Sequence, residues 1–200
     1  MEKIRNFEEK DIKEASAIAY EIWSPELEGV SESVKKVIYE YLVRYYYTSD
    51  TLSFALLAED KVKAFILTDD KIEANESANC YLEEMASTLT DMERKYLYDY
   101  KKYLDYNQEK VRERLEKNSV CVELFASVQK GAGSKLLNVV EGHCIENGVK
   151  YLYLWTDATC NYKFYDAKGY KVVDSYEGIM DFNGNKTLTF IYRKELKETL

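Results

Sequence analysis

The chain has 200 residues, of which 46% are hydrophobic and 32% are charged, a balance that favours a folded globular protein over a disordered one. Its net charge of −8 argues against nucleic acid as a partner, because phosphate backbones are bound by concentrated basic surfaces. No apolar run reaches the length of a membrane span and the N-terminus has no signal-peptide pattern, so we expect a cytoplasmic protein with no membrane partner.

The sequence offers little for a metal site or a disulfide framework. Its four cysteines, Cys80, Cys121, Cys144 and Cys160, include no C-x-x-C pair. His143 is the single histidine, which excludes any site that needs two imidazoles. We therefore expect reduced thiols, no metal, and a structural or surface role for His143.

The N-terminal third combines strands and amphipathic helices. A strand at 4–7 is followed by two helices, whose apolar faces recur over 12–23 and 34–45. Two apolar runs, 52–58 and 62–67, flank three charged residues and predict a β-hairpin. Two helices are thus expected between the first strand and the second.

The segment 76–118 contains no glycine or proline, and its apolar side chains are spaced through a charged background. This pattern predicts two or three helices, with breaks at 88–91 and 105–107. The segment lies within 69–119, the stretch that separates the third predicted strand from the fourth. We interpret it as a helical insertion that covers one side of a sheet.

The second half of the chain alternates strands and helices. The apolar run at 151–155 is typical of a strand inside a parallel pair. Near the C-terminus, Asn183-Gly184 predicts a hairpin turn. The expected elements are a strand at 120–127, a helix at 131–146, a strand at 151–155, a short helix at 161–168, and strands at 171–180 and 186–193. The order indicates one α/β domain with a mixed sheet over 1–200.

A glycine turn joins the strand at 120–127 to the helix at 131–146. It reads Gln129-Lys130-Gly131-Ala132-Gly133-Ser134-Lys135. Glycines let a ligand approach the backbone closely, and the free amides of a helix start attract anions. The turn therefore predicts a phosphate cradle, although a plain tight turn explains the same residues. It is neither a P-loop nor a dinucleotide fingerprint, because it lacks the G-K-[ST] ending and a third glycine.

With Asn161 and the run Phe164-Tyr165-Asp166-Ala167-Lys168-Gly169-Tyr170, this turn resembles the GCN5-related N-acetyltransferase (GNAT) superfamily. Members typically carry a Q/R-x-x-G-x-G/A turn after the fourth strand and, later, an Asn followed by F-Y-x-x-x-G-F. The match is strongest over 120–170. Two features depart from the family pattern: Val128 stands where Arg or Gln is usual, and 69–119 replaces a short turn.

The resemblance implies a GNAT-like acyl-CoA N-acyltransferase fold and an enzyme that uses acetyl-CoA as cosubstrate. The acetyl group would pass by direct attack to a primary amine of a small molecule or peptide. The end of the fourth strand would bind the pantetheine amides, and the turn would hold the pyrophosphate. The cofactor-binding residues implied are Leu124, Phe125, Ala126, Ser127, Gln129, Lys130, Gly131, Ala132, Gly133, Ser134, Asn161 and Tyr165.

The resemblance also implies that Tyr165 protonates the departing CoA thiolate, a role for which a phenol is suited. A core aromatic is the alternative for Tyr165. Direct attack needs a proton acceptor, and Glu123 and Asp157 are the candidates, with a solvated surface residue as the alternative for each. Glu123 is favoured, because strand alternation sets it opposite Leu124 and toward the cleft. Cys160 is disfavoured as a nucleophile, because nothing nearby in the sequence activates it.

A second function class stays open at this point: a catalytically silent acyl-CoA-binding or regulatory module on the same fold. If the chain is an enzyme, its negative charge favours a cationic acceptor such as a polyamine, an aminoglycoside or a lysine side chain. We expect the insertion to form one wall of the acceptor pocket, with charged residues such as Glu83, Glu84 or Asp99. The alternative is that the acceptor pocket lies along the first two helices, around 23–30. A homodimer is compatible with the sequence.

Overall fold

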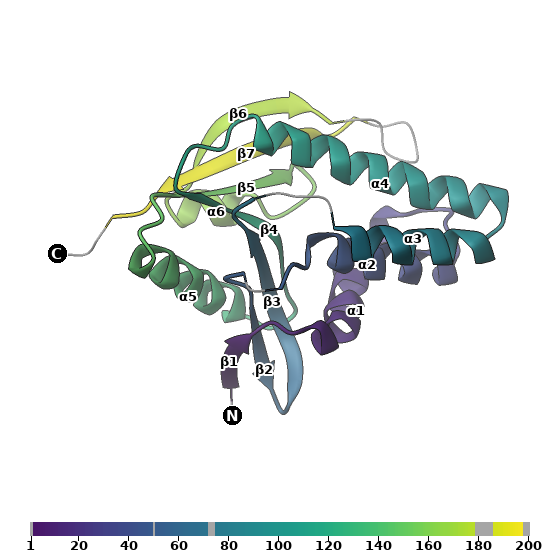
Figure 1. The fold of residues 1–200 in the computed structure, drawn as a ribbon, viewed down its shortest axis with the longest axis horizontal. Helices are drawn as coiled ribbons and strands as arrows, with labels where there is room; N and C mark the ends of the chain where they lie inside the picture. Colours follow the sequence, from purple (N-terminus) through teal and green to yellow (C-terminus); the bar gives the residue numbers. More distant parts are fainter. Residues whose placement is uncertain (1, 50, 72–74, 179–185, 198–200) are drawn as a thin grey trace.

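The computed structural model describes residues 2–49, 51–71, 75–178 and 186–197. In these ranges the chain forms a seven-stranded mixed sheet with the order β1-β2-β3-β4-β5-β7-β6, flanked by helices (Figure 1). The strands are β1 (Glu2–Asn6), β2 (Phe54–Ala58), β3 (Lys61–Asp69), β4 (Ser119–Ser127), β5 (Tyr151–Asp157), β6 (Lys171–Glu177) and β7 (Leu188–Glu195). The mixed α/β fold class predicted from the sequence is confirmed.

The helices follow the predicted order. They are α1 (Ile12–Trp23), α2 (Glu32–Tyr46), α3 (Glu76–Thr88), α4 (Asp91–Arg112), α5 (Ala132–Glu146) and α6 (Lys163–Ala167), with short 3-10 helices η1 (Glu9–Asp11) and η2 (Ser24–Glu26). Among the described residues, no helix combines the length and the apolar character needed to cross a membrane.

The sheet has two antiparallel parts joined by one parallel pair. Strands β1 to β4 form an antiparallel meander, which includes the predicted hairpin of β2 and β3. Strands β5, β7 and β6 form the second antiparallel part. The parallel pair is β4 with β5, which confirms the expected parallel partner for the apolar run at 151–155. The predicted Asn183-Gly184 turn lies outside the described residues.

The central strands project apolar side chains from both faces of the sheet. On β3, Phe65 and Leu67 enter a core formed with α1 to α4, whereas Ala64 and Ile66 enter a second core formed with α5. Successive residues of a strand point to opposite faces, so β3 supplies both cores at once. Figure 1 shows the same arrangement, with α5 on one side of the sheet and α1 to α4 on the other.

Helices α3 and α4 lie between β3 and β4 in the chain and confirm only part of the predicted breaks. The first break is present, where Thr90 and Glu93 form a capping box at the start of α4. The second predicted break, at 105–107, is wrong, because α4 continues through it to Arg112. Buried Asn107 donates to the Tyr103 carbonyl of the same helix at 2.8 Å and accepts from the Tyr176 hydroxyl of β6 at 2.8 Å. One local and one tertiary hydrogen bond thus satisfy its side chain inside the helix.

Candidate active site

Strands β4 and β5 diverge soon after they meet. They pair only over 119–121 and 151–153. Beyond this point β4 stays bonded to β3 as far as Ser127, and β5 stays bonded to β7 as far as Asp157. The edge of β4 that faces β5 therefore has no strand partner from Val122 onward, and its backbone is free to bind an extended ligand.

A cavity of about 800 Å³ occupies this divergence. Its walls are residues 122–127 of β4, residues 154–157 of β5, the loop that leads into α6, and side chains of α1, η2, α2 and α4. The side chains from α4 are Lys95, Tyr96, Asp99, Tyr100, Lys102, Tyr103 and Leu104. Of the two helices between β3 and β4, α4 thus forms part of the cavity wall and α3 does not, and the end of α1 also lines it.

Glu123 lies at an irregularity of β4. Leu67 of β3 pairs with Leu124, but the next residue, Thr68, pairs with Val122, so Glu123 is the extra residue of a β-bulge. The expectation that simple alternation sets Glu123 opposite Leu124 is therefore wrong. Leu124 faces the α1 to α4 side, and Glu123 reaches α4 on that side through Gln108. The bulge turns the carboxyl into the cavity wall.

The carboxyl of Glu123 is almost inaccessible, since the residue is 6% exposed. Burial raises its pKa to about 7, although the hydrogen bond from Gln108 opposes that shift. Its other oxygen, Oε1, accepts no hydrogen bond of good geometry from the described residues, although the neighbouring Cys121 thiol also lowers the pKa. Glu123 also lines a second, polar cavity of about 280 Å³ on its far side. A buried carboxyl that titrates near neutrality has the pKa of a general base.

The glycine turn stands at the other end of the cavity, where α5 begins. Gly131 has φ of 81°, a conformation that favours glycine, and only Gly133 of the turn lines the cavity. A Cβ on Gly133 would lie 3.1 Å from the Phe125 ring, so glycine is needed for packing as well as for access. The Ala132 amide bonds to the Gln129 carbonyl, which leaves the next amides of the helix start directed outward.

Two polar side chains of the turn are tied to the first strand. Gln129 donates to Glu2 Oε1 at 2.6 Å, and Lys135 forms an ion pair with the same carboxylate. Both side chains are donors that an anion would use, so Glu2 competes for them. The pair with Lys135 lowers the pKa of Glu2 and keeps that carboxyl ionised.

The chain matches no family model and no curated protein. Solved structures resemble it over nearly their whole length. The E. coli ribosomal-protein-S18-alanine N-acetyltransferase is 14% identical with a TM-score of 0.56, covering 100% of this chain and 97% of that one. The Enterococcus faecium aminoglycoside 6'-N-acetyltransferase is 14% identical with a TM-score of 0.55, covering 99% of each chain. A Desulfovibrio desulfuricans protein assigned to the GNAT family is 11% identical with a TM-score of 0.55, covering 98% and 100%.

The fold is the GNAT fold. At the level of the fold, these solved structures confirm the resemblance noted in the sequence. Identities of 11% and 14% do not carry residue roles across, so each role in this GNAT fold is argued from the chain's own geometry.

Tyr165 lines the cavity from α6, and its ring packs against Phe164, Tyr170 and Tyr192. Burial raises the pKa of the phenol, so it stays protonated and able to donate. Asn161 is exposed and lines the cavity just before α6. In this GNAT fold the predicted pair Asn161 and Tyr165 therefore lies on the β5 side of the divergence, opposite β4.

Asp157, the second candidate proton acceptor, and Cys160, the disfavoured nucleophile, both line the cavity at the end of β5 and in the loop after it. Asp157 accepts hydrogen bonds from the Thr159 hydroxyl at 2.5 Å and the Tyr103 hydroxyl at 3.1 Å. Burial raises the pKa of the Cys160 thiol to about 12, so it remains protonated near neutral pH. His143 stacks on Phe54 on the α5 side of the sheet, in keeping with the structural role expected for it.

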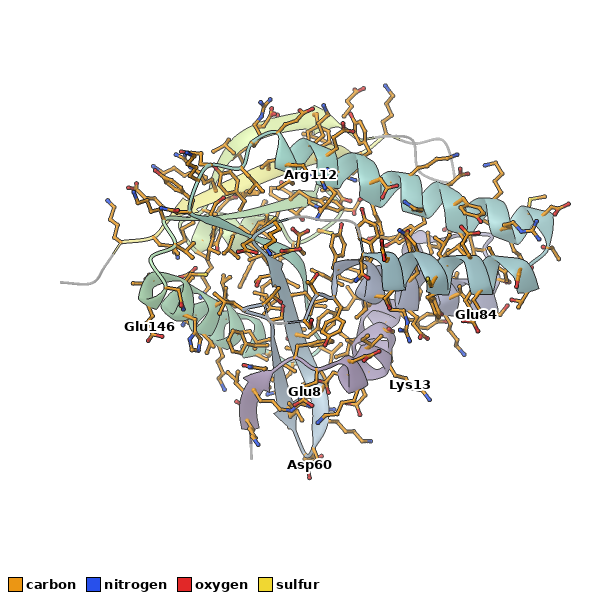
Figure 2. The ribbon with its side chains drawn as sticks, in the orientation of Figure 1. Glu8, Lys13, Asp60, Glu84, Arg112 and Glu146 are labelled. Atoms are coloured by element: carbon orange, nitrogen blue, oxygen red, sulfur yellow. The ribbon has the colours of Figure 1, made fainter. Side chains whose placement is uncertain are left out.

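The sequence pointed to Glu83, Glu84 and Asp99 as charged residues of a pocket wall, and only Asp99 lines the cavity. Glu83 accepts a hydrogen bond from Tyr98 on the surface, and Glu84 lies exposed on α3 (Figure 2). Gln108, which holds the Glu123 carboxyl, was not identified from the sequence. The one sign of Gln108 in the sequence is that a polar residue stands among the apolar residues along one face of a long helix.

The described part of the chain contains no group of three or more side chains that could hold a metal ion. The cavity wall includes a buried carboxyl at Glu123, a phenol at Tyr165 and the free edge of β4.

Proposed function

We propose that the protein is an N-acetyltransferase, which moves the acetyl group of acetyl-CoA to a primary amine by direct attack. The observation that carries the proposal is the position of Glu123, a buried carboxyl with a pKa of about 7 in the wall of the cavity between β4 and β5. The GNAT fold, shared with N-acetyltransferases of known acceptors, supports it.

Acetyl-CoA would lie along the free edge of β4. The backbone of 124–127 would hydrogen-bond the pantetheine amides as a neighbouring strand does. The pyrophosphate would lie on the amides of 130–134, where the start of α5 presents positive partial charge. Gln129 and Lys135 would add donors once released from Glu2. Asn161 would contact the pantetheine arm from the opposite side of the cavity.

Glu123 would act as the general base. An amine attacks a thioester only when its nitrogen is neutral, and most aliphatic amines are protonated near pH 7. With a pKa of about 7, Glu123 is substantially ionised near neutrality and can take a proton from the attacking nitrogen. Oε1, to which no N–H or O–H group of the described residues donates, is the oxygen that would accept that proton.

Tyr165 would act as the general acid. As the carbon–sulfur bond breaks, negative charge develops on sulfur, and the phenol donates its proton there. The raised pKa of Tyr165 keeps the proton available in the resting enzyme. The two proton transfers involve opposite walls of the cavity, with Glu123 on β4 and Tyr165 on α6.

The proposal is tested by measuring CoA release from acetyl-CoA against a panel of primary amines that includes diamines, an aminoglycoside and a lysine peptide. Amine-dependent thiol release by the wild type, and its loss in Glu123→Gln with CoA binding retained, is the expected result. CoA binding without release for any amine would instead identify a catalytically silent acyl-CoA-binding module.

A further inference from the structure

Two carboxyl groups of the cavity wall lie beside the same hydroxyl, that of Thr159. Glu26 comes from η2, Asp157 ends β5, and both line the cavity. The Thr159 hydroxyl oxygen lies 2.5 Å from Asp157 Oδ1 and 3.5 Å from Glu26 Oε1, so it joins the two side chains. Partial burial, followed by the charge of Asp157, raises the pKa of the Glu26 carboxyl. The pair therefore concentrates negative charge at one point of the wall.

No basic side chain of the cavity wall is left to neutralise this pair. The two lysines that line the cavity, Lys95 and Lys102, both pair with Asp99. Like charges held this close disfavour each other unless a cation lies between or beside them. A cationic ligand would supply what the described residues do not.

Aromatic rings form a continuous surface beside the pair. Tyr39 contacts Tyr100 with ring centroids 6.4 Å apart, Tyr100 contacts Tyr103 at 6.0 Å, and Tyr103 contacts Trp155 at 5.6 Å. All four line the cavity, and the Tyr103 hydroxyl donates to Asp157. Aromatic faces attract ammonium groups, and they also cover the methylene groups between two nitrogens.

Three deeply buried residues of the same cavity wall carry a polar atom that accepts or donates no hydrogen bond of good geometry among the described residues. They are the hydroxyls of Tyr46 and Thr189, at 3% and 1% exposure, and Oε1 of Glu123 at 6% exposure, which the Cys121 thiol also approaches. Buried polar atoms are almost always hydrogen-bonded, so these atoms favour ordered water or a polar ligand beside this wall. The cavity wall thus has polar groups on α2, β4 and β7 and, separately, the carboxyl pair of Glu26 and Asp157.

We infer that the Glu26–Asp157 pair is a subsite for a second positive charge on the acceptor, and that the acceptor is a linear aliphatic diamine or polyamine. Its distal ammonium binds the two carboxylates, its methylenes lie along the aromatic rings, and its reacting nitrogen reaches Glu123. This inference rests on the proposed N-acetyltransferase function.

The first test is binding, measured by titration calorimetry without acetyl-CoA. 1,4-Diaminobutane is compared with 1-aminobutane, which has the same carbon chain and one charge fewer. We expect the diamine to bind the wild type about ten-fold more tightly or better, because it alone places an ammonium at the pair. In Glu26→Gln this selectivity should fall to about two-fold or less. Glu26 is an exposed residue of η2 whose carboxyl accepts a hydrogen bond from Thr159, so its substitution by the isosteric glutamine removes no core side chain.

Glu21→Gln is the matched control, since Glu21 is an exposed carboxylate of α1 outside the cavity and should keep the wild-type selectivity. Asp157→Asn provides a second variant of the pair. Equal binding of the two amines by the wild type, or unchanged selectivity in both variants, overturns the inference.

Turnover separates this inference from the proposed function. The ratio of kcat/KM for the diamine to that for the monoamine should exceed about ten in the wild type and approach one in Glu26→Gln. Selective, Glu26-dependent diamine binding without CoA release supports the subsite and contradicts the enzyme. CoA release at equal kcat/KM from both amines supports the enzyme and contradicts the subsite, as does preferred turnover of an aminoglycoside.

Discussion

The side-chain amide of Gln108 donates a hydrogen bond to Oε2 of Glu123 and so joins the middle of α4 to the bulge of β4. This bond favours the ionised carboxylate and lowers its pKa, against the larger effect of burial. Gln108 thereby sets the pH at which Glu123 can accept a proton, and it fixes the carboxyl in the cavity wall.

Gln108→Leu should move the acidic limb of the kcat/KM profile to higher pH. Removing the donor raises the Glu123 pKa, so a higher pH is needed to ionise the base. The limb is measured between pH 5 and 9 with a saturating acetyl-CoA concentration. Gln108→Glu tests the same bond with an added charge and should shift the limb in the same direction. An unmoved limb in both variants would show that Glu123 is not the titrating base.

Glu123 should also make the protein less stable as the pH rises. Its folded pKa of about 7 exceeds its ordinary value of 4.5, so the folded state binds more protons between these values. Its favourable contribution is therefore complete below pH 4.5 and lost by about pH 7, an effect on the order of 3 kcal/mol. Urea unfolding at pH 5 and pH 8 should show Glu123→Gln gaining stability relative to wild type at the higher pH. A constant difference between the two proteins would contradict the raised pKa.

Gly133→Val should weaken CoA binding by at least about ten-fold in calorimetry. The new side chain displaces the Phe125 ring, which lines the cavity, and covers the amides at the start of α5. Gly142→Val is the control, because it places the same residue in the same helix where nothing lies within 4 Å. Both variants are checked by thermal unfolding. Equal CoA affinity in Gly133→Val and wild type would remove the pyrophosphate from this turn.

Tyr165→Phe should lower turnover by about 10²- to 10⁴-fold while leaving CoA affinity unchanged, provided that chemistry limits the rate. The phenol acts on charge that develops only as the thiolate leaves. Tyr162→Phe is the matched control, since Tyr162 is a half-buried tyrosine outside the cavity that packs on Phe190. A wild-type kcat in Tyr165→Phe over the full pH range would leave Tyr165 as a packing residue.

Asp99→Asn should raise the KM of a cationic acceptor without changing the KM of acetyl-CoA. Asp99 pairs with Lys95 and Lys102, and its neutralisation leaves two positive charges in the cavity wall that repel the acceptor. Glu84→Gln, on the exposed surface of α3, should behave as wild type in the same assay (Figure 2). Unchanged acceptor kinetics in Asp99→Asn would place the acceptor away from α4.

Local patterns were sufficient for the order of strands and helices, because apolar periodicity and turn residues act over short distances. They fail where a contact between residues far apart in the sequence determines the local structure. The break expected at 105–107 is absent because Tyr176 satisfies Asn107 from β6, 69 residues away in sequence. No local rule anticipates such a contact.

The candidate site shows the same limit. Glu123 can be chosen from the sequence as a candidate because it is an acidic residue in an apolar strand. The direction in which its side chain points depends on a β-bulge, and only the pairing of β4 with β3 shows that bulge. The ion pair of Lys135 and Glu2 joins residues 133 positions apart, so no local pattern indicates that a donor of the glycine turn is already paired. The Glu26–Asp157 pair likewise joins two segments that only the fold brings together.

The most direct test of the account is the mass of the amine product after incubation with trideuteroacetyl-CoA and 1,4-diaminobutane. The account predicts an N-trideuteroacetyl diamine with the wild type and with Tyr162→Phe, and none above background with Glu123→Gln. Product formed at the wild-type rate by Glu123→Gln, or no labelled amine from the wild type across the amine panel despite bound CoA, would contradict it.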